Sequence, residues 1–494
     1  MSTIQSLEQV LERKQAIRQG ETAWAAKQQS GGKLTARARV EALLDPASFV
    51  ELDCLVTRDG LAEGVVTGYG TVDGRPVYVF SQDYTVKAGA VTRAHAAKIV
   101  KVLELARKCG APVVGMCDSA GARLEEGPGA MDAYASIFAH VARLSGVVPT
   151  VGLVLGPCVG AAAILPTLMD VTLAVPGLGQ LMAVGPAVAS EELGQTVNAE
   201  ALGGAKAQAK QGGIHLLCPD EKTAFAKVRK LLGLLPDNNL EDAPLESPDD
   251  LNRKLSALNA AEAFSVIEGL LDNGSAFPLS ETYAPNLLTV LGRMGGRSVG
   301  IVANHAMEAD GKLDVAACRK AARFVRLCDC FNVPVISLIN TKGLAATGPM
   351  GQADLLKAVG QLTYAYAEAT CTKLAVVTGM AIGAGYVAMG GKAVADVTYA
   401  WPGAVISPLL PEAAVALYEK DAITASKGDA KKARQELADK YAAEVADGVQ
   451  AAIQGLVDDV IDPADTRKML ISALEMLASK RDQNPPKKHG NLPL

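Results

Sequence analysis

The stretch GVVPTVGLVLGPCVGAAAILPTLMDVTLAV, residues 146–175, contains no charged side chain between Arg143 and Asp170. Its apolar length would suit a membrane-spanning helix, but three prolines interrupt it, and proline removes a backbone donor and breaks helix continuity. We therefore predict a buried strand at 150–155, a tight turn of small residues at 156–162 and then a buried helix. Such a turn leaves backbone N–H groups at a helix start, where they can hold an anionic oxygen.

A second copy of this stretch lies downstream, as LAVVTGMAIGAGYVAMGGKAVADVTYAW at residues 374–401. Gly156 and Gly160 align with Gly379 and Gly383 at a shift of 223. Upstream the shift is 222, and the residues that match at this shift are Gly74 with Gly296, Lys98 with Lys320, Pro112 with Pro334, and Gly121 with Gly343. Matches at nearly one register indicate an internal duplication, so two similar halves are predicted.

Composition limits the class of protein. The chain has 494 residues, of which 49% are hydrophobic and 4% aromatic, with 48 glycines, as is typical of an α/β protein with closely packed small residues. The net charge of -5 is spread along the chain, which predicts no nucleic-acid partner. The nine cysteines form no CxxC pair and no zinc-type spacing with histidine, so no metal site is expected. The opening MSTIQSLEQV has no signal-peptide pattern, which predicts a reduced, cytoplasmic protein.

Apolar strands alternate with amphipathic helices, which predicts an α/β fold with a largely parallel, covered sheet in each half. The elements expected in the first half are a helical collar at 3–45, a hairpin turning on Asp73 and Gly74, a helix at 92–109, a strand at 111–117 and a helix ending near 144. The second half repeats this order, with a hairpin around Gly295 and Gly296, a helix at 315–328 and strands at 333–339 and 374–379.

The domain organisation follows from the repeat and from one acidic segment. Residues 236–250, polar and punctuated by proline, are predicted to link an N-terminal domain at 1–235, which includes the collar, to a C-terminal domain at 251–494. The region 429–481 is expected to be helical. The tail NPPKKHGNLPL is expected to pack on a neighbour or hang free.

Each half carries two small-residue loops after buried strands: DSAGAR and GPCVGA in the first, NTKGLA and MAIGAG in the second. In a parallel sheet such loops gather at the carboxyl ends of the strands, which is the usual ligand-binding edge. Two N–H groups from two loops could form an oxyanion hole for a thioester enolate. The alternative is that these glycines only allow close packing of helix against sheet.

The motifs that carry a family resemblance run along nearly the whole chain: KLTARARVEALLDPASFVELD, GVVTGYGTVDGRPVYVFSQD, DSAGARLEEG, GPCVGAA, LGRMGGRSVGIVAN, AARFVRLCDCFNVP, ADVTYAWP and PPKKHGNLPL. This ordered set resembles the carboxyltransferase subunit of biotin-dependent acyl-CoA carboxylases and sodium-pumping acyl-CoA decarboxylases, the propionyl-CoA carboxylase beta and methylmalonyl-CoA decarboxylase alpha family. The resemblance implies two tandem crotonase-like (ClpP/crotonase) domains. It also implies a dimer in which the first domain of one subunit faces the second domain of the other, and a ring-shaped hexamer.

The resemblance also implies a reaction and a set of site residues. A carboxyl group would move between biotin and a malonyl-, methylmalonyl- or glutaconyl-type acyl-CoA, with no side-chain base. By position, Gly160 and Ala161 would hold the ureido oxygen of biotin, and Ala384 and Gly385 would hold the thioester oxygen. The substrate-binding residues implied in the same way are Ser119, Ala120, Gly121, Ala122, Arg123, Gly343 and Val387.

The sequence departs from the family pattern in several places. The family more usually has Gly-Gly at 160–161 and Gly-Ala at 384–385, SGGAR at 119–123, and DTPGF where this chain has NTKGL at 340–344. Lys357 and Ala358 stand in place of an Arg-His pair. The second-half changes fall nearer the biotin end of the site than the CoA end. Val387 stands where propionyl-preferring relatives often have Asp, at a position that shapes the acyl pocket.

The partners follow from what the chain lacks. It has no biotinylation signature of the Met-Lys-Met type and no ATP-grasp segment, so a separate biotin carboxyl carrier protein is expected. The other partner would be a biotin carboxylase or a membrane sodium-pumping decarboxylase subunit. The protein would then be cytoplasmic, or attached to the inner membrane through its partners.

Two other functions remain open from the residues alone. Glu125 and Glu126 lie beside the first loop, where a biotin-independent crotonase-type hydratase, isomerase or decarboxylase could place an acid or base. A non-catalytic scaffold subunit is the second alternative. The lone histidines His95 and His305 are predicted to be scaffold, and Cys158 is predicted to be a packing residue rather than a nucleophile.

Overall fold

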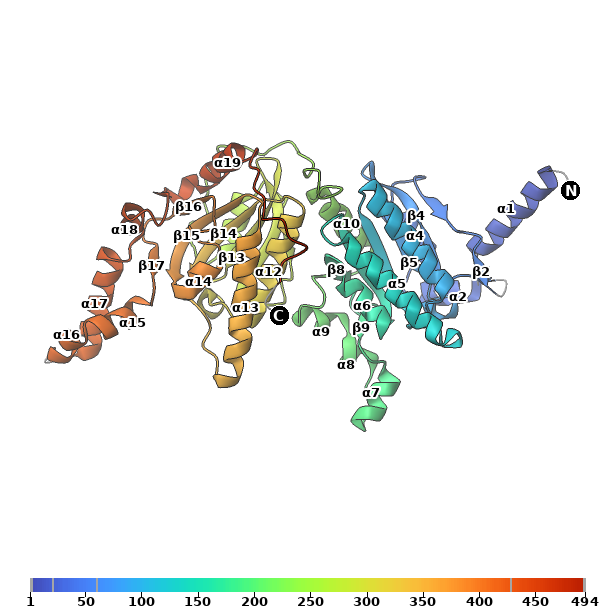
Figure 1. Ribbon diagram of the computed structural model, residues 1–494, viewed down its shortest axis with the longest axis horizontal. Coiled ribbons are helices and arrows are strands. Elements are labelled where there is room, and N and C mark those ends of the chain that lie inside the picture. Colours follow the sequence, from blue (N-terminus) through green and yellow to red (C-terminus); the bar gives the residue numbers. More distant parts are fainter. Residues whose placement is uncertain (1–2, 20–21, 59–60, 427–428, 492–494) are drawn as a thin grey trace. The chain divides into compact units, whose positions relative to one another are not determined.

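The computed structural model describes residues 3–19, 22–58, 61–426 and 429–491 (Figure 1). The chain divides into two compact units, Met1–Glu241 and Asp242–Leu494. This division lies within 236–250, but that segment is not a free linker. In the first unit Arg75 donates to Asp237 at 2.9 and 2.5 Å, and in the second Arg293 donates to the Pro244 carbonyl at 2.6 Å.

The described part of the first unit contains one large mixed sheet, with the strand order β1-β4-β5-β6-β7-β8-β10 and β9 beside β7. β1, β4 and β5 pair antiparallel, and the remaining neighbours pair parallel. The strands are β1 Val50–Leu52, β4 Val65–Val72, β5 Arg75–Gln82, β6 Val113–Ser119, β7 Thr150–Val159, β8 Val171–Ala174, β9 Gln180–Met182 and β10 Leu216–Leu217. A short antiparallel pair, β2 Thr57–Arg58 and β3 Leu61–Ala62, stands apart. The hairpin predicted at Asp73 and Gly74 is confirmed.

Helices cover this sheet, and their apolar faces form the core of the first unit. α4 begins after Thr92, whose side chain accepts the His95 N–H, and it buries Ile99 and Leu103 against the strands. α4 and α5 lie side by side, as Figure 1 also shows. The helices are α1 Thr3–Gln19, α2 Thr22–Ser30, α3 Ala36–Leu43, α4 Arg93–Cys109, α5 Pro128–Leu144, α6 Ala161–Thr167, α7 Pro186–Leu193, α8 Ala199–Gly203, α9 Ala205–Lys210 and α10 Glu221–Leu234, with short 3-10 turns η1 Lys87–Gly89 and η2 Leu124–Glu126.

The second unit repeats the sheet of the first. Its strand order is β11-β12-β13-β14-β15-β16-β18, with β17 beside β15. The strands are β11 Phe277–Leu279, β12 Leu287–Met294, β13 Arg297–Asn304, β14 Val335–Thr341, β15 Lys373–Ile382, β16 Val397–Ala400, β17 Val405–Ser407 and β18 Asp459–Val460. The helices and turns are α11 Ala263–Leu270, η3 Ala309–Gly311, α12 Val315–Cys330, α13 Pro349–Glu368, α14 Gly383–Ala388, α15 Pro411–Tyr418, α16 Lys420–Ala425, α17 Ala430–Glu444, α18 Gly448–Ile453, η4 Pro463–Asp465 and α19 Thr466–Met476.

Equivalent residues make equivalent contacts in the two units. The buried Lys98 donates to the Val65 carbonyl at 2.7 Å, and its counterpart Lys320 donates to the Leu287 carbonyl at 2.7 Å. Each ammonium therefore ties the first helix after the hairpin to the start of a hairpin strand. The duplication predicted from the sequence is a duplication of structure.

The decisive stretch differs from the prediction in one respect. The strand predicted to end at 155 continues to Val159, because the strand bulges opposite Cys117 and Ser119 and its last residues pair with β9. β15 extends to Ile382 in the same way, with a register shift and pairing to β17. The turn is therefore shorter than expected and centres on Gly160.

A carboxylate holds the hairpin turn of each unit. Asp45 accepts the backbone N–H groups of Asp73 and Gly74 at 3.1 and 2.9 Å and pairs with Arg229 of α10 at 2.7 Å. In the second unit Asp272 accepts the N–H groups at the Gly295–Gly296 turn at 3.1 and 2.8 Å and pairs with Arg467 of α19 at 2.7 Å. The last long helix of each unit is thereby fastened to the hairpin that begins its sheet.

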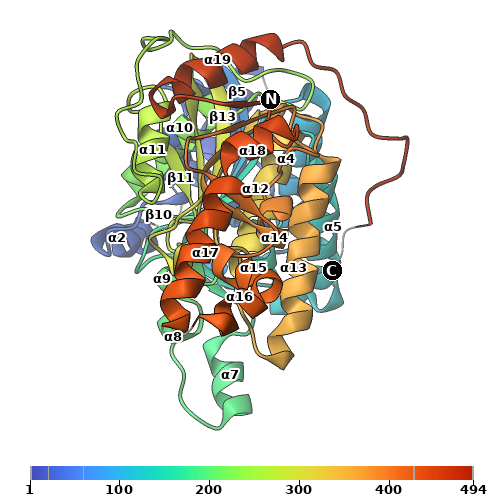
Figure 2. The same cartoon turned by 90° about the vertical axis from the view of Figure 1, so that its left-hand side faces the viewer.

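The described residues of 429–481 are mostly helical, as predicted, and form α17, α18 and α19 with the short strand β18 before α19. Figure 2 shows α17 together with α15 and α16, which precede it. The described part of the tail contacts its own unit, which contradicts the alternative that it hangs free. Asn484 donates to the Glu368 carbonyl at 2.8 Å, and Lys487 pairs with the Glu368 carboxylate. Among the described helices, none combines the length and the hydrophobicity needed to cross a bilayer.

Candidate active site

The loop after β6 is held by the η1 turn. The Ser119 hydroxyl donates to the Gly89 carbonyl at 2.7 Å and accepts the Gly121 N–H at 3.1 Å. The Ala120 N–H donates to Ala88 at 2.9 Å, and the Arg123 N–H donates to Val91 at 3.0 Å. In the described chain the Ala122 N–H is the one backbone donor of residues 120–123 without an acceptor.

The loop after β14 repeats this arrangement. The Gly343 N–H donates to the Thr341 hydroxyl at 3.1 Å, the Lys342 N–H to Asp310 at 3.3 Å, and the Ala345 N–H to Leu313 at 2.9 Å. Gly121 and Gly343 have φ values of 111° and 101°, which favour glycine. Within the described residues the Leu344 N–H has no acceptor. It is the counterpart of the Ala122 N–H.

The turn after β7 changes the role expected for Gly160. Its N–H donates to the Met182 carbonyl at 2.8 Å, so this group is not available to a substrate oxygen. Gly160 instead supplies the turn, with a φ of 59°, and a Cβ built on it would meet nothing within 4 Å. Ala161 is the first residue of α6, where an N–H has no acceptor within the helix.

The turn after β15 leads into α14. Gly383 has a φ of 54°, and the exposed Ala384 follows it in the first turn of the helix, where N–H groups lack helical acceptors. Gly385 is buried. Val387 is 62% exposed and lies three residues beyond Ala384, so both are on one open face of α14.

In each unit the two loops contact each other through glycine. A Cβ on Gly121 would lie 3.1 Å from the Val159 carbonyl oxygen, and a Cβ on Gly385 would lie 2.8 Å from the Gly343 Cα. The predicted loop residues 119–123 therefore adjoin the turn that carries Ala161. In the second unit Gly343 adjoins the turn that carries Ala384 and Gly385.

An ion pair flanks the second-unit loop. Lys342 Nζ lies 2.8 Å from Asp310 of η3, where the first unit has Ala120 and Ala88 at the corresponding positions. Both units have a backbone hydrogen bond at this place, from Lys342 to Asp310 and from Ala120 to Ala88. The ion pair between the Lys342 and Asp310 side chains adds a second contact in the second unit only. The unusual NTKGL segment is thus fixed to η3.

The two glutamates weighed as general bases are both bound in other interactions. Glu125 pairs with Arg123 at 3.2 Å, and Glu126 accepts the Arg93 N–H at 2.8 Å at the start of α4. A hydrogen bond to its own N–H, together with Arg123, lowers the pKa of Glu125. A lowered pKa makes this carboxylate a weaker base.

The lone histidines and the turn cysteine are part of the scaffold. His95 is buried, and desolvation, with Lys98 nearby, lowers the pKa of its imidazole to about 3, so the ring is neutral. His305 Nδ1 lies 3.3 Å from the Pro285 carbonyl oxygen. Burial raises the pKa of the Cys158 thiol, which opposes formation of a nucleophilic thiolate.

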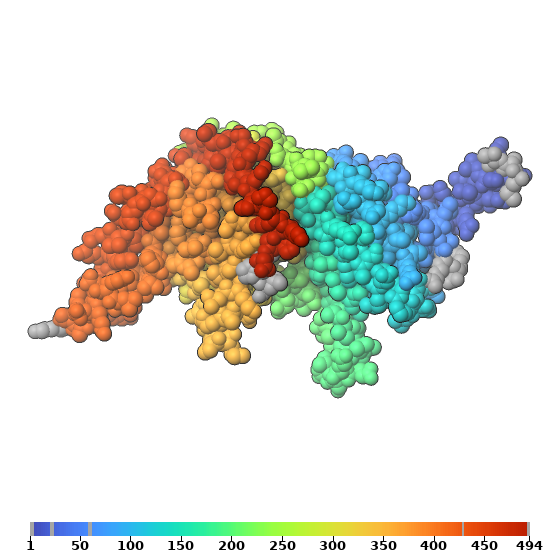
Figure 3. Space-filling model, in the orientation of Figure 1, coloured from blue at the N-terminus to red at the C-terminus, as the bar shows by residue number. Residues whose placement is uncertain are grey.

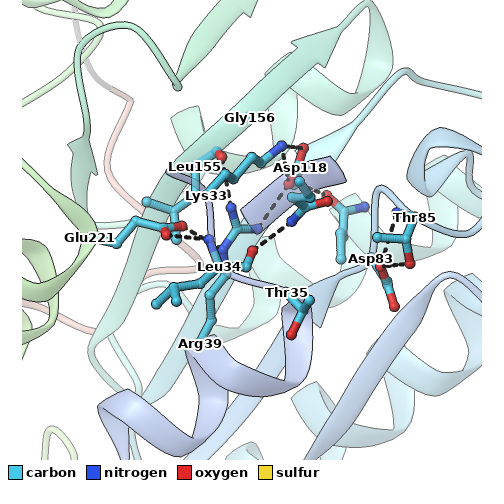
Figure 4. Close-up of polar contacts among 12 residues, drawn as sticks. Lys33, Leu34, Thr35, Arg39, Asp83, Thr85, Asp118, Leu155, Gly156 and Glu221 are labelled. Carbon is cyan, nitrogen blue, oxygen red and sulfur yellow. Dashed lines mark hydrogen bonds and ion pairs between the residues drawn. The ribbon is translucent and has the colours of Figure 1, made fainter. Parts of the chain in front are cut away.

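Four charged residues beneath the first loop were not singled out from the sequence. Arg39 lies between two carboxylates (Figure 4), with Nη1 2.9 Å from Asp118 and Nε 2.6 Å from Glu221. Lys33 Nζ lies 2.6 Å from Asp118 Oδ2. Burial raises the pKa of Asp118, while Arg39 and Lys33 act in the opposite direction. The available signal was the run KLTARAR at residues 33–39, which contains Lys33 and Arg39 together with a third cation, Arg37.

The described residues offer no set of side chains that could bind a metal ion. No group of three or more His, Cys, Asp or Glu side chains is placed to hold a metal ion there.

Two units of this fold, each with a loop and a helix-start turn of small residues at the carboxyl edge of its sheet, define a tandem crotonase-like acyl-CoA enzyme. Residues 27–492 match the carboxyl transferase domain family. The chain belongs to this family, and it is a carboxyltransferase subunit of the acyl-CoA carboxylase and decarboxylase type. The family, the fold and the carboxyltransferase activity predicted from the sequence are confirmed.

Relatives resemble the chain over nearly its full length. The alpha subunit of methylmalonyl-CoA decarboxylase from Veillonella parvula is 42% identical over 491 residues, which is 95% of this chain and 94% of the relative. The carboxyltransferase subunit of propionyl-CoA carboxylase from Haloferax mediterranei is 39% identical and covers 98% of both chains. The crystal structure of transcarboxylase 12S, a hexamer assembly with methylmalonyl-CoA and methylmalonic acid bound, superimposes with a TM-score of 0.95 at 37% identity, covering 100% of this chain and 99% of that chain.

Proposed function

We propose that this protein moves a carboxyl group between a short acyl-CoA and biotin carried on a separate protein. The observation that carries the proposal is the pair of equivalent sites, each with two backbone N–H groups that have no acceptor among the described residues and that lie on touching segments. The relatives act on methylmalonyl-CoA or propionyl-CoA, and methylmalonyl-CoA is bound in the transcarboxylase 12S structure. These names favour a three- or four-carbon acyl group.

The first-unit site would use the N–H groups of Ala122 and Ala161, with Gly160 shaping the turn. The second-unit site would use those of Leu344 and Ala384, with Gly385 allowing close contact. Pairs of backbone donors stabilise a developing oxyanion without reorganisation, and removal of one such donor costs about 10²–10³ in rate. The proposal thus keeps the two turns predicted from the sequence. It replaces the Gly160 N–H with that of Ala122 in the first-unit site, and the Gly385 N–H with that of Leu344 in the second-unit site.

The two sites would divide the reactants. We assign the ureido oxygen of biotin to the first-unit site and the thioester oxygen to the second-unit site, where Val387 borders the acyl group. The open space above Gly160 is compatible with a planar ring approaching the backbone. Bound biotin would supply a nitrogen that releases the carboxyl group and takes the α-proton. The protein groups orient both reactants and hold negative charge on their oxygens.

The partners we propose are a biotin carboxyl carrier protein and either a biotin carboxylase or a membrane sodium-pumping decarboxylase subunit. A cytoplasmic location, or attachment to the inner membrane through the decarboxylase subunit, follows from this proposal. Because transcarboxylase 12S is a hexamer assembly, we propose a hexamer for this chain. Domains at 1–235 and 251–494, joined by 236–250, remain the proposed division of function, with one site in each.

The test is carboxyl transfer from malonyl-CoA and methylmalonyl-CoA to free biotin. Ala161→Pro removes the N–H at a helix position that tolerates proline, whereas Ala161→Ser keeps it and serves as the control. We expect Ala161→Pro to lower transfer by about 10²–10³ relative to Ala161→Ser. Equal rates for the two variants would contradict the donor role of Ala161. Absence of transfer by the unaltered protein from either ester would contradict the proposed reaction.

A further inference from the structure

Lys33, Arg39, Asp118 and Glu221, which we call the collar cluster, contact both segments that form the first-unit site. Asp118 immediately precedes Ser119 and the loop that carries the Ala122 N–H. Arg39 Nη2 donates to the Leu155 carbonyl at 2.9 Å, on the bulge of β7 that leads to Ala161. One guanidinium therefore fixes the two backbones whose N–H groups are the proposed donors.

The bulge is shaped to hold this cluster. A Cβ on Gly156 would lie 1.8 Å from Asp118 Oδ1 and 2.7 Å from Lys33 Nζ, so the carboxylate and the ammonium occupy the space that a side chain would take (Figure 4). Arg39 and Asp118 are fully buried, and Lys33 keeps 14% of its side chain exposed. The Leu34 N–H also donates to Glu221 at 2.7 Å, which fastens the collar segment to α10.

At the equivalent place in the second unit, a neutral side chain fills the space beside the glycine. Asn340 replaces Asp118, donates to the Ala260 carbonyl at 3.0 Å and accepts the Met380 N–H at 3.0 Å. A Cβ on Gly379 would lie 2.4 Å from the Asn340 side-chain oxygen, just as a Cβ on Gly156 would meet the Asp118 carboxylate. The backbone N–H groups of Asp118 and Asn340 donate to matching side chains, Gln82 at 3.1 Å and Asn304 at 3.2 Å.

The fold therefore does not require ions at this place, and burying charged groups is costly unless they are paired. We propose that the collar cluster is a set of positioning residues that fixes the first-unit site, and that Lys33 tunes its affinity for biotin. This inference rests on the proposed function for its assignment to biotin. Lys33 is the adjustable member because it is partly exposed and stacks over the Tyr84 ring, 4.8 Å from the centroid.

The experiment compares Lys33→Met, which removes the charge, with Lys33→Arg, which restores it. Lys27→Met is the control, since Lys27 is an exposed cation of the same collar that lies over Trp24. For transfer from malonyl-CoA to free biotin, we expect Lys33→Met to raise the KM for biotin about tenfold, with kcat and the KM for malonyl-CoA changing less than about threefold. Lys33→Arg should recover most of the loss, and Lys27→Met should match the unaltered protein.

Hydrogen exchange gives a second readout that does not depend on activity. Lys33→Met should speed amide exchange in peptides spanning 119–123 and 157–162, and leave the equivalent second-unit peptides, 341–345 and 380–385, unchanged. Unchanged exchange at both first-unit peptides, or a KM for biotin equal to that of Lys27→Met, would overturn the positioning role. A rise in the KM for malonyl-CoA alone, with the exchange change, would overturn the assignment of biotin to this site. Absence of transfer by the unaltered protein would refute the proposed function, while the exchange result would still decide the positioning role.

Discussion

At the scale of single residues, Gly385 is where α14 comes close to the backbone of the loop after β14 in the second-unit site. A Cβ there would lie 2.8 Å from the Gly343 Cα and 3.1 Å from its carbonyl oxygen. Both neighbouring atoms belong to backbone, which cannot rotate away as a flexible side chain can. Any larger residue must therefore push α14 away from the loop that carries the Leu344 N–H.

We expect Gly385→Ala to destabilise the second unit by about 1–3 kcal/mol, because the added methyl group overpacks a rigid contact. Transfer should fall further than stability alone explains, since the two donors are displaced relative to each other. Thermal unfolding and steady-state transfer would measure the two effects. Gly233→Ala in α10 is the matched control: a Cβ there meets nothing within 4 Å, and alanine favours helix. A Gly385→Ala protein as stable and active as this control would contradict the contact.

At the scale of elements, Asp45 and Asp272 connect the hairpin of each unit to its last long helix. Asp45 is bound by two turn N–H groups, by the Thr71 hydroxyl at 2.8 Å and by Arg229. The hydrogen bond from the Gly74 N–H, followed by that from Arg229, holds the pKa of Asp45 well below its usual range. The ionised form is thus preferred in the folded protein.

The lowered pKa of Asp45 predicts how the stability of the protein depends on pH. A carboxyl whose pKa is lowered by folding stabilises the protein above its unfolded pKa of about 4, and the contribution is lost as the pH falls below that value. We expect Asp45→Asn to lower the apparent melting temperature at pH 7 by about 2–4 °C. The difference from the unaltered protein should begin to shrink below about pH 5 and keep shrinking as the pH falls through the unfolded pKa of about 4 towards the lower folded-state pKa. Calorimetry across this range measures it, with the exposed Asp354→Asn as control, and a difference independent of pH would contradict the linkage.

At the scale of the whole molecule, α7 and the residues before it leave apolar side chains in solvent. Figure 3 shows this segment, in green, protruding from the body of the first unit. Val184, Val188 and Leu193 are 41%, 51% and 61% exposed. A protruding apolar helix is typical of a subunit contact, and the similar transcarboxylase 12S is a hexamer assembly.

We expect the double variant Val188→Glu, Leu193→Glu to lower the molecular mass measured by light scattering, because buried glutamates would oppose assembly. The circular dichroism spectrum should not change, since α7 packs little against its own unit. Glu192→Gln on the same helix changes a polar side chain and should leave the mass as it is. A double variant of unaltered mass would show that α7 is not a subunit contact.

How much could be predicted from the sequence differs between the fold and the site. The hairpins, α4, α5 and α12 follow from local turn chemistry and from apolar periodicity, and these signals recur at nearly constant spacing in both halves. The small-residue loops could be placed at the carboxyl edge of the sheet because parallel strands leave no other place for them. The strand end at 155 was wrong because a bulge and an added partner strand carry no local signal.

The sequence by itself determined the duplication, the fold and the family, since these depend on patterns that lie along the chain. Only the tertiary structure decided which backbone donors are free. From the sequence, Gly160 and Ala161 are equally good candidates for a free backbone N–H. In the structure the Gly160 N–H donates to the carbonyl of Met182, the last residue of β9. The collar cluster joins residues 79 and 182 positions apart, which only the tertiary fold brings together. Hydrogen-bond partners are chosen by proximity in space, which periodicity and spacing do not encode.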